Sequence, residues 1–436
     1  MSIQPSKDWS LSQWLKYLES IHPSEIDLGL DRVRQVYQRL NLSWSMQTVI
    51  TVAGTNGKGT TCAMLEQASI LQNKSVGVYS SPHISEYNER VRINQTLLHD
   101  YKHCQAFMAV EKARGDTLLT YFEFGTLAAL VLLNKPSIEI VLLEVGLGGR
   151  LDATNVVEPD IAVITSIGLD HQAFLGDTRD AIAREKAGII RANKPVIIGE
   201  IDPPPSLQQI PQELNADARW AGKDFIYSVL DDVWHYSSQG LNVTTSLPSI
   251  PLPNAATALA VLEALNWAIN PVFIQTLVEK TRLSGRLQKI TPDALNPNNV
   301  PFLLDVAHNP QAAEYLAKHL HLLGFTGSDN TSAAKLHAIF GAFKDKDIKG
   351  VLDPLIPLLS SLHCVTLPGE RAADKAELAV VAQSISETLD INTTESIDDA
   401  YQAVLKTAHS DDLVLVFGSF FTVEALLTFL KSNAEN

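Results

Sequence analysis

The chain has 436 residues, of which 45% are hydrophobic and 19% charged, and its formal net charge is −15. A chain of this length exceeds one ordinary hydrophobic core, so we expect two or three domains. The negative charge argues against non-specific binding to nucleic acid or to an anionic membrane, because both attract basic surfaces.

The sequence indicates a cytoplasmic protein. Its three cysteines, Cys62, Cys104 and Cys364, are far apart and lack the spacing of a metal site. The first eight residues contain no apolar signal region, and no run approaches the roughly 20 apolar residues of a membrane span. We therefore expect a reducing compartment and no disulfides.

Two helices are predicted first, over 10–21 and 30–40, with a capping box formed by Ser10 and Gln13. Strands and helices then alternate. Strands are predicted over 48–53, 75–80, 138–145, 161–167 and 195–199, and helices over 60–72, 101–113, 123–134 and 178–190. The continuous apolar strands indicate a mostly parallel sheet covered on both faces. Short antiparallel strands over 224–247 and helices over 254–267 and 271–281 follow.

A second α/β pattern begins after residues 284–301, which are rich in turn formers. We predict a first domain over 1–286, a linker over 287–300 and a smaller, Rossmann-like domain over 301–436. Its strands are predicted over 302–306, 335–341, 362–366 and 412–417, and its helices over 310–322, 347–359, 374–387, 397–407 and 420–431.

Residues 53–60, Ala-Gly-Thr-Asn-Gly-Lys-Gly-Thr, lie between a predicted strand and a predicted helix. Glycines let backbone N–H groups surround an anion, and the helix N-terminus adds its positive end. Lys58 can reach the β- and γ-phosphates of a nucleotide, and the hydroxyl of Thr60 or Thr61 can meet a phosphate or Mg²⁺. The P-loop match is imperfect, because Val52 replaces the first glycine and Gly59 follows the lysine. A glycine-rich turn without function is the alternative.

Three polar residues, Ser81, Glu144 and His171, each follow or end a predicted strand of the first sheet. The carboxyl ends of parallel strands meet at one edge, where ligands bind. Burying the charge of Glu144 is costly unless it is paired or binds a metal. We therefore predict a shared Mg²⁺ site, although Mg²⁺ prefers oxygen ligands and a histidine is unusual.

Several of these segments have structural alternatives. Ser81 with Pro82 could form only a turn. Arg150 and Asp152, beyond the glycines that follow Glu144, could form a structural ion pair. The charged residues 184–188 could simply complement the dipole of a helix C-terminus.

The chain resembles the folylpolyglutamate synthase family of the Mur ligase superfamily. Its motifs occur in the order Gly54–Thr60, Ser81–His83, Thr120–Glu123, Glu144–Asn155, Asp170–His171, Glu185–Gly188 and Asp305–Pro310. The segments 26–33 and 119–124 resemble those of the bacterial bifunctional members, which carry both dihydrofolate synthase and folylpolyglutamate synthase activities.

The resemblance implies a P-loop, Mur-ligase-like first domain and a glutamate ligase second domain. It implies that ATP phosphorylates the carboxylate of dihydropteroate or of a tetrahydrofolyl-glutamate, and that L-glutamate then attacks the acyl phosphate. Two Mg²⁺ ions would assist, and the protein would be a monomer.

The resemblance also assigns residues to roles. Contacts to ATP would come from Thr55, Asn56, Gly57, Lys58, Gly59, Thr60, Asn254, Arg286 and Asp305. The metal ligands would be Ser81, Glu144, His171 and a carbamylated Lys186. The pterin substrate would contact Asp27, Asp31, Thr120, Tyr121, Phe122, Glu123, Leu151, Asp152 and Ala153. The catalytic groups would be Lys58, Lys186, Arg286 and His308.

Other functions remain open at this point. The enzyme could be a folylpolyglutamate synthase only, or a cell-wall Mur-type ligase, although only about 45 residues precede the P-loop strand. A nucleotide-binding switch without ligase turnover would leave Asp305 and His308 unexplained.

Overall fold

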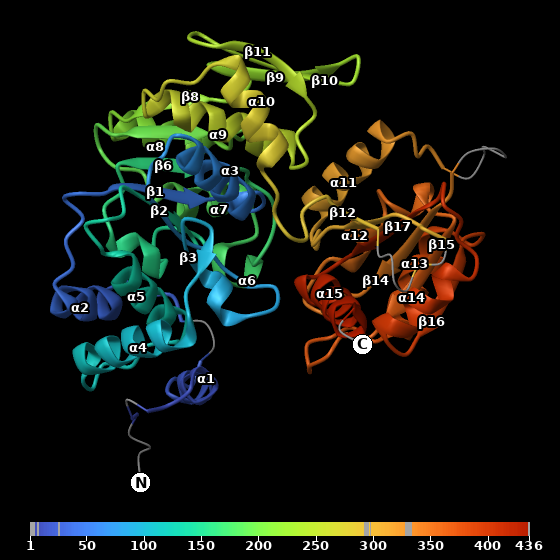
Figure 1. The fold of residues 1–436 in the computed structure, drawn as a ribbon, viewed down its shortest axis with the longest axis horizontal. Helices are drawn as coiled ribbons and strands as arrows, with labels where there is room; N and C mark the ends of the chain where they lie inside the picture. The colour runs from blue at the N-terminus through green and yellow to red at the C-terminus, as the bar shows by residue number, and fades with distance from the viewer. Residues whose placement is uncertain are drawn as a thin grey trace. The chain divides into compact units, whose positions relative to one another are not determined.

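The computed structural model describes residues 5–6, 8–24, 27–291, 296, 298–327 and 334–434. The chain forms two compact units, Met1–Thr281 and Arg282–Asn436, each with its own sheets and cores (Figure 1). Ile26, at the start of the predicted 26–33 segment, and part of the predicted linker lie outside the described residues.

The first unit is built on an eight-stranded sheet in the order β4-β3-β2-β5-β1-β6-β7-β8. Strands β2, β5, β1, β6, β7 and β8 are parallel to one another. Strand β3 is antiparallel to β2, and β4 is antiparallel to β3. Their bounds are β1 Thr48–Ala53, β2 Val76–Tyr79, β3 Val91–Ile93, β4 Thr96–Leu97, β5 Ile140–Glu144, β6 Ile161–Ile164, β7 Pro195–Ile198 and β8 Asp217–Trp220.

Helices cover both faces of this sheet, as the continuous apolar strands predict. Their bounds are α1 Leu11–Ser20, α2 Asp31–Leu40, α3 Lys58–Leu71, α4 Asp100–Arg114, α5 Tyr121–Leu133, α6 Gln172–Leu175, α7 Arg179–Ala187, α8 Pro205–Glu213, α9 Leu252–Ala264 and α10 Pro271–Lys280, with short 3₁₀ helices η1 Tyr87–Arg90 and η2 Ala153–Val156. The capping box of Ser10 and Gln13 at α1 is confirmed.

Alternate side chains of one strand enter different cores, which is the period-two pattern of a strand. Ile140 and Leu142 of β5 pack with residues of α3 and α9, and Val141 and Leu143 pack with residues of α4 and α5. Figure 1 shows α3 and α9 on the opposite side of these strands from α4 and α5. Burial on both sides holds β5 and β1 rigidly in the middle of the sheet.

A separate antiparallel sheet, β9 Phe225–Leu230, β10 Val233–Ser238 and β11 Asn242–Ser246, forms within the segment predicted for it. Its buried aromatic residues Phe225, Trp234 and Tyr236 join the same core as α9 and α10.

The second unit contains a six-stranded sheet in the order β12-β13-β17-β14-β15-β16, parallel except for β12. Its strands are β12 Gln288–Ile290, β13 Phe302–Leu304, β14 Leu336–Phe340, β15 Ser361–Val365, β16 Asp390–Thr394 and β17 Leu413–Phe417. Its helices are α11 Pro310–Leu322, α12 Ile348–Leu352, η3 Ile356–Leu358, α13 Lys375–Ile385, α14 Ile397–Leu405 and α15 Phe420–Ala434. The α/β fold class with two largely parallel sheets is confirmed.

Strands β3, β4 and β8 and helices α6 and α8 of the first unit were not predicted, and the structure differs from the prediction at three further points. The helix predicted over 347–359 is interrupted after Leu352, where Pro354 and Pro357 cannot continue a hydrogen-bonded helix. Strand β16 was not predicted, because its sequence is mostly polar. The units divide between Thr281 and Arg282, and β12 places residues 288–290, expected in a linker, within the second sheet.

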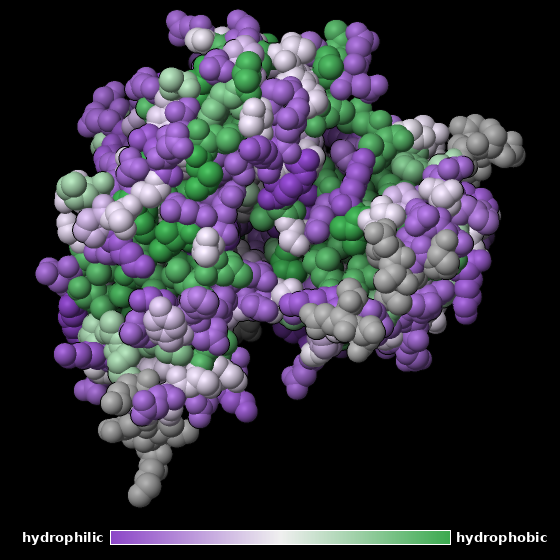
Figure 2. Space-filling view, in the orientation of Figure 1, coloured by the Kyte–Doolittle hydropathy of each residue, from purple (hydrophilic) through white to green (hydrophobic). Residues whose placement is uncertain are grey.

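The surface is mixed in character. Figure 2 shows hydrophilic residues over much of the face in view, with apolar residues interspersed among them. Within the described part of the chain, no helix combines the length and the hydropathy needed to cross a membrane.

Two buried histidines lie on one face of the second sheet. His337 of β14 pairs with Ser361 of β15, and His363 lies two residues further along β15, on the same face. Burial lowers the pKa of both imidazoles below the ordinary value, and Asp412 opposes the shift at His337 while Asp390 opposes it at His363. The folded protein therefore holds both rings neutral.

We predict that acid destabilises this unit through these histidines. An unfolded histidine takes up a proton near pH 6.5, whereas the folded site resists it, so stability is complete above about pH 6.5 and falls below it. The melting temperature of His363→Gln should fall less than that of wild type between about pH 7.5 and 5.5. The matched control is His321→Gln, at an exposed residue. An equal fall in the His363→Gln protein would contradict the prediction.

Candidate active site

The loop between β1 and α3 has the backbone geometry of an anion cradle. Gly57 precedes α3 in the left-handed region at φ 87°, which glycine adopts without strain. The loop is anchored on residues that follow β6, since the N–H of Thr55 donates to the Ser166 carbonyl at 2.8 Å and the Thr165 hydroxyl donates to the Asn56 carbonyl at 2.6 Å. The sequence did not single out Thr165 and Ser166, because their role depends on the pairing of β1 with β6.

Asn254, near the start of α9, covers the same loop. A Cβ placed on Gly57 would lie 2.2 Å from the Asn254 Oδ1 atom. This close approach brings a residue predicted to contact the nucleotide against the P-loop, although the two positions are far apart in the sequence.

Two lysines converge on one carbonyl oxygen. Lys58 Nζ and Lys186 Nζ each lie 3.0 Å from the Gly54 oxygen. Burial, and then the charge of Lys58, lower the pKa of Lys186 to about 7, although Asp170 and Asp152 oppose the shift. Lys186 lies in the last turn of α7 but is only 4% exposed, so it does not act as a surface charge that complements a helix dipole.

Buried polar groups line the start of α3. Within the described residues, the hydroxyls of Thr60 and Thr61 are buried and have no hydrogen-bond partner. Buried hydroxyls are normally paired, so the first turn of α3 fits a further polar group. Burial, and then the negative charge of Glu144, raise the pKa of the Cys62 thiol well above its ordinary value.

The predicted metal ligands follow neighbouring strands. Ser81 follows β2, Glu144 ends β5 and His171 lies beyond β6, and these strands flank β1 in the order β2-β5-β1-β6. Glu144 pairs in register with Val52 and is buried, whereas His171 is exposed. The described residues contain no group of three or more His, Cys, Asp or Glu side chains placed to hold a metal, so a site that also needs Ser81 and Lys186 stays a prediction.

The glycine loop after β5 is held by Asp152. One carboxylate oxygen of this buried side chain accepts the N–H groups of Gly146 and Leu147 at 3.0 and 2.9 Å, and the other accepts the N–H and hydroxyl of Thr154 at 3.0 and 2.6 Å. Burial raises the pKa of Asp152, and these four bonds oppose the shift. Asp152 therefore positions the loop. The alternative of an Arg150–Asp152 pair is wrong, because Arg150 pairs with Glu185 at 2.8 Å.

The residues predicted to contact the pterin come from separate segments that the structure partly joins. Thr120 caps α5 in a capping box with Glu123, and Arg32 links Glu123 to Asp27. Asp31 lies outside this group, since its exposed carboxylate pairs with Arg34 at 3.1 Å. The sequence analysis did not identify Arg32 as a site residue, because its partner lies in another helix.

The ring of Phe122 connects the start of α5 to the glycine loop that follows β5. A Cβ on Gly146 would lie 2.2 Å from the Phe122 ring, so only glycine allows this approach. Of the neighbouring predicted residues, Leu151 is half-buried and Ala153 is buried at the start of η2.

The second unit brings Arg286, Asp305 and His308 to the carboxyl edge of its own sheet. Buried Asp305 accepts the N–H groups of Leu287 and Ala307, both at 2.9 Å. Burial raises the pKa of Asp305, and the charge of Arg286 opposes the shift. The Arg286 guanidinium lies 4.9 Å from the centre of the Phe420 ring. Phe420 was missed, because nothing near it in the sequence marks it.

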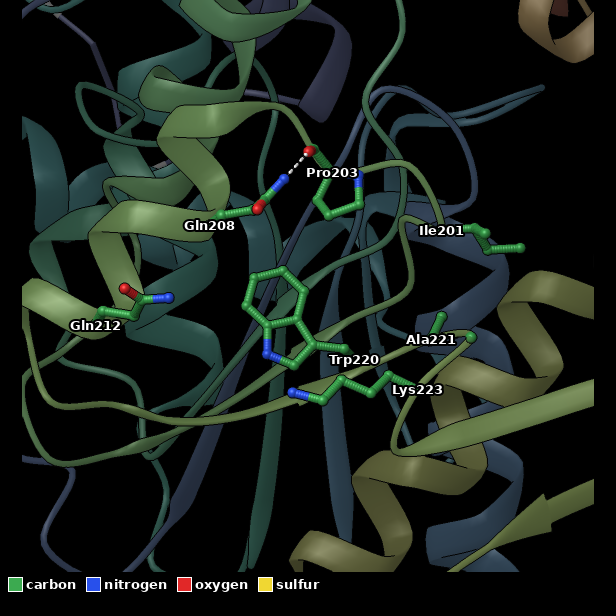
Figure 3. A pocket seen from close by; sticks show the side chains of 8 residues that line it. Ile201, Pro203, Gln208, Gln212, Trp220, Ala221 and Lys223 are labelled. Atoms are coloured by element: carbon green, nitrogen blue, oxygen red, sulfur yellow. Dashed lines mark hydrogen bonds between the residues drawn. The ribbon is translucent and has the colours of Figure 1, made fainter.

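None of the predicted residues lines the surface hollow shown in Figure 3. This hollow of about 370 Å³ lies beside α8 and the end of β8, where Gln208, Gln212 and Lys223 surround the ring of Trp220. It is separate from the P-loop edge at β1, since β6 and β7 lie between β1 and β8.

Comparisons with known proteins agree with the α/β fold of this chain. Residues 110–218 match the Mur ligase middle domain, and residues 285–420 match the Mur ligase glutamate ligase domain. The chain is 43% identical over 424 residues to the dihydrofolate synthase/folylpolyglutamate synthase of Escherichia coli, with 97% of this chain and 96% of that protein covered.

Two solved structures are similar over almost the whole chain. E. coli FolC in complex with DHPP and ADP has a TM-score of 0.90 and 40% identity, covering 99% of this chain and 100% of that one. The bifunctional folylpolyglutamate synthase/dihydrofolate synthase of Yersinia pestis, complexed with AMPPNP and a Mn ion, has a TM-score of 0.89 and 40% identity, covering 98% and 100%.

We predict that Asp152→Asn destabilises the protein. The new amide would turn a donor toward N–H groups that now donate to a carboxylate, so the cost should be about 1–3 kcal/mol of unfolding free energy. Denaturant unfolding measures it. Asp31→Asn, at a 93% exposed side chain, is the matched control and should change stability by less than about 0.5 kcal/mol. Equal stability of the two variants would show that Asp152 does not hold the loop.

Proposed function

The chain belongs to the dihydrofolate synthase/folylpolyglutamate synthase family, whose members are ATP-dependent ligases of folate metabolism, and from this premise we propose its acceptors and site chemistry. It joins L-glutamate to dihydropteroate, and to the γ-carboxyl group of tetrahydrofolyl-(poly)glutamate. Both reactions pass through an acyl phosphate of the acceptor. The DHPP and ADP bound to E. coli FolC support this choice of acceptor.

The observation that carries the proposal is the shared contact of Lys58 and Lys186 with the Gly54 oxygen. Two lysine side chains this close repel each other unless an anion lies beside them or one of them is neutral. The unpartnered hydroxyls of Thr60 and Thr61 at the N-terminus of α3 fit the oxygens of that anion. These groups fit the phosphates of ATP and a divalent metal.

Lys58 would neutralise charge on the transferred phosphoryl group, because phosphoryl transfer depends on alignment and electrostatic stabilisation. When bound, Mg²⁺ would supply further positive charge, and Ser81, Glu144, His171 and a carbamylated Lys186 would hold two ions. Asn254, together with Arg286 and Asp305 in the second unit, would contact the nucleotide.

His308 would accept the proton that glutamate loses as its amine attacks. The His308 Nδ1 atom lies 2.8 Å from the Val306 carbonyl oxygen, which can only accept, so Nδ1 carries the proton and Nε2 is the basic nitrogen. Transfer of this proton to Nε2 frees the lone pair on the glutamate nitrogen, which forms the C–N bond to the acyl carbon, and the C–O bond to the phosphate breaks as inorganic phosphate leaves. We also propose that the enzyme is a cytoplasmic monomer.

The test is glutamate-dependent ADP release by the purified protein with each acceptor in turn. Wild type should release ADP with dihydropteroate and with tetrahydrofolate. Lys58→Ala should lose about 10²-fold or more in turnover while remaining folded, as expected for one lost electrostatic stabiliser. Near-normal turnover of a folded Lys58→Ala protein would reject the P-loop assignment. If wild type releases ADP with tetrahydrofolate but not with dihydropteroate, the enzyme is a folylpolyglutamate synthase only.

We predict that Lys186 reacts with CO₂. With a pKa of about 7 instead of 10.5, much of the amine is neutral near neutral pH, and its lone pair can form an N–C bond to CO₂ with release of one proton. The product carries two oxygens, which suit Mg²⁺. Lys186→Ala and Lys186→Arg should both be nearly inactive.

A direct measurement accompanies these activity assays. Protein kept under isotopically labelled CO₂ should show a carbamate carbon signal that Lys186→Arg lacks. More carbamate should form as the pH rises through about 7, because the neutral amine is the reactive form. An unmodified side chain together with an active Lys186→Arg protein would refute the carbamate.

A further inference from the structure

Arg32 joins two segments that lie far apart in the sequence. Its Nε atom lies 2.9 Å from both carboxylate oxygens of Glu123, which is in the first turn of α5. On the other side of the guanidinium, Nη1 lies 2.5 Å from the Asp27 carboxylate and Nη2 lies 2.5 Å from the Asp27 carbonyl oxygen. Every nitrogen of the group therefore has a partner, and Arg32 acts as a clamp.

The Glu123 carboxylate depends on this clamp. Its side chain is only 6% exposed, and a buried charge is costly without a partner. One oxygen also accepts the N–H of Thr120 at 2.8 Å, which completes the capping box of α5. Arg32 thus supports the group that fixes the start of α5.

The geometry requires an arginine. A guanidinium presents its donors in a rigid planar fork, so it can bind one carboxylate through two bonds and still reach a second partner. A lysine at the same place would carry the charge but would present one nitrogen. Burial alone would lower the pKa of Arg32, but the bonds and charges of Glu123 and Asp27 outweigh it and raise the pKa.

The clamp acts on the residues assigned to the pterin acceptor under the proposed function. Thr120 and Glu123 bracket Tyr121 and Phe122, and the Phe122 ring rests on Gly146. Loss of Arg32 would release the start of α5, and a shift there would move these aromatic side chains. It would also leave Asp27 without its bonds to the guanidinium.

We propose that Arg32 is a positioning residue that sets recognition of the pterin acceptor, by holding Asp27 against the N-terminus of α5. This inference rests on the proposed function, because it takes from there the assignment of Thr120–Glu123 to the acceptor. Arg32 itself need not touch the acceptor, since its nitrogens are already engaged.

The same helix offers a matched control. Arg34 pairs with Asp31 at 3.1 Å, but its side chain is 49% exposed and that of Asp31 is 93% exposed. Surface pairs three residues apart on a helix contribute little to stability. Arg34→Gln therefore removes the same charge from α2 without touching α5.

The experiment measures steady-state kinetics of Arg32→Lys, Arg32→Gln and Arg34→Gln, with acceptor and ATP varied separately. Both Arg32 variants should raise the KM for dihydropteroate and tetrahydrofolate about tenfold or more, the scale of a lost charged hydrogen bond. The KM for ATP should stay within about twofold, because the P-loop contacts are unaffected. Arg34→Gln should match wild type in every parameter.

Glu123→Gln gives a second, independent measurement. If Arg32 works through Glu123, the Arg32→Gln/Glu123→Gln protein should have an acceptor KM close to that of Arg32→Gln alone, since residues in one network are not additive. Fully additive effects would overturn the clamp. So would an acceptor KM unchanged from wild type, or equal rises in the KM for acceptor and for ATP, whatever the change in melting temperature.

The outcomes for the two proposals are distinguishable. If wild type ligates glutamate to neither acceptor, the proposed function fails and this inference fails with it. If wild type is active and the Arg32 and Arg34 variants behave alike, the inference alone is wrong.

Discussion

The first unit depends on one crowded point, the carbonyl oxygen of Gly54, to which both Lys58 and Lys186 donate. The two lysines come from different helices, and the carbonyl stands at the end of the central strand β1. Their mutual repulsion is relieved when Lys186 is neutral, as its lowered pKa allows, or when an anion lies beside the two side chains. The same repulsion favours the binding of an anion beside the two lysines, and the sheet holds the loop rigidly in the place where that anion would bind.

The parallel sheet supplies that rigidity through its order of strands. Because β1 lies between β5 and β6, the P-loop can be anchored by Thr165 on one side and face Glu144 on the other. In an antiparallel arrangement the neighbouring strands would end at opposite edges, and these side chains would be separated by the length of a strand. Strand order therefore determines which residues can act together.

The elements predicted best from the sequence are those whose structure depends on residues close together in the chain. The apolar strand β1, the glycine loop and α3 were predicted because burial, turn chemistry and helix periodicity all act within about 25 residues. Helix α8 was missed, because Pro203, Pro204 and Pro205 resemble a loop, yet Pro205 occupies the first turn of the helix, where proline is tolerated. Contacts between distant segments were also missed: Arg32 and Glu123 are 91 positions apart, and no local signal connects them. Candidate site residues at strand ends were easier to predict than the side chains that position them.

The contact between Gly57 and Asn254 has a consequence for how the chain can vary. Two separate limits act on position 57: its left-handed backbone, and the amide that would meet a Cβ at 2.2 Å. A smaller residue at position 254 would relieve the second limit but not the first. A substitution at position 254 alone therefore meets no steric obstacle from Gly57. A substitution at position 57 would strain the backbone whichever residue faces it. The pair is therefore asymmetric: a smaller side chain at position 254 removes the clash, but it leaves the backbone strain that any side chain at position 57 would meet.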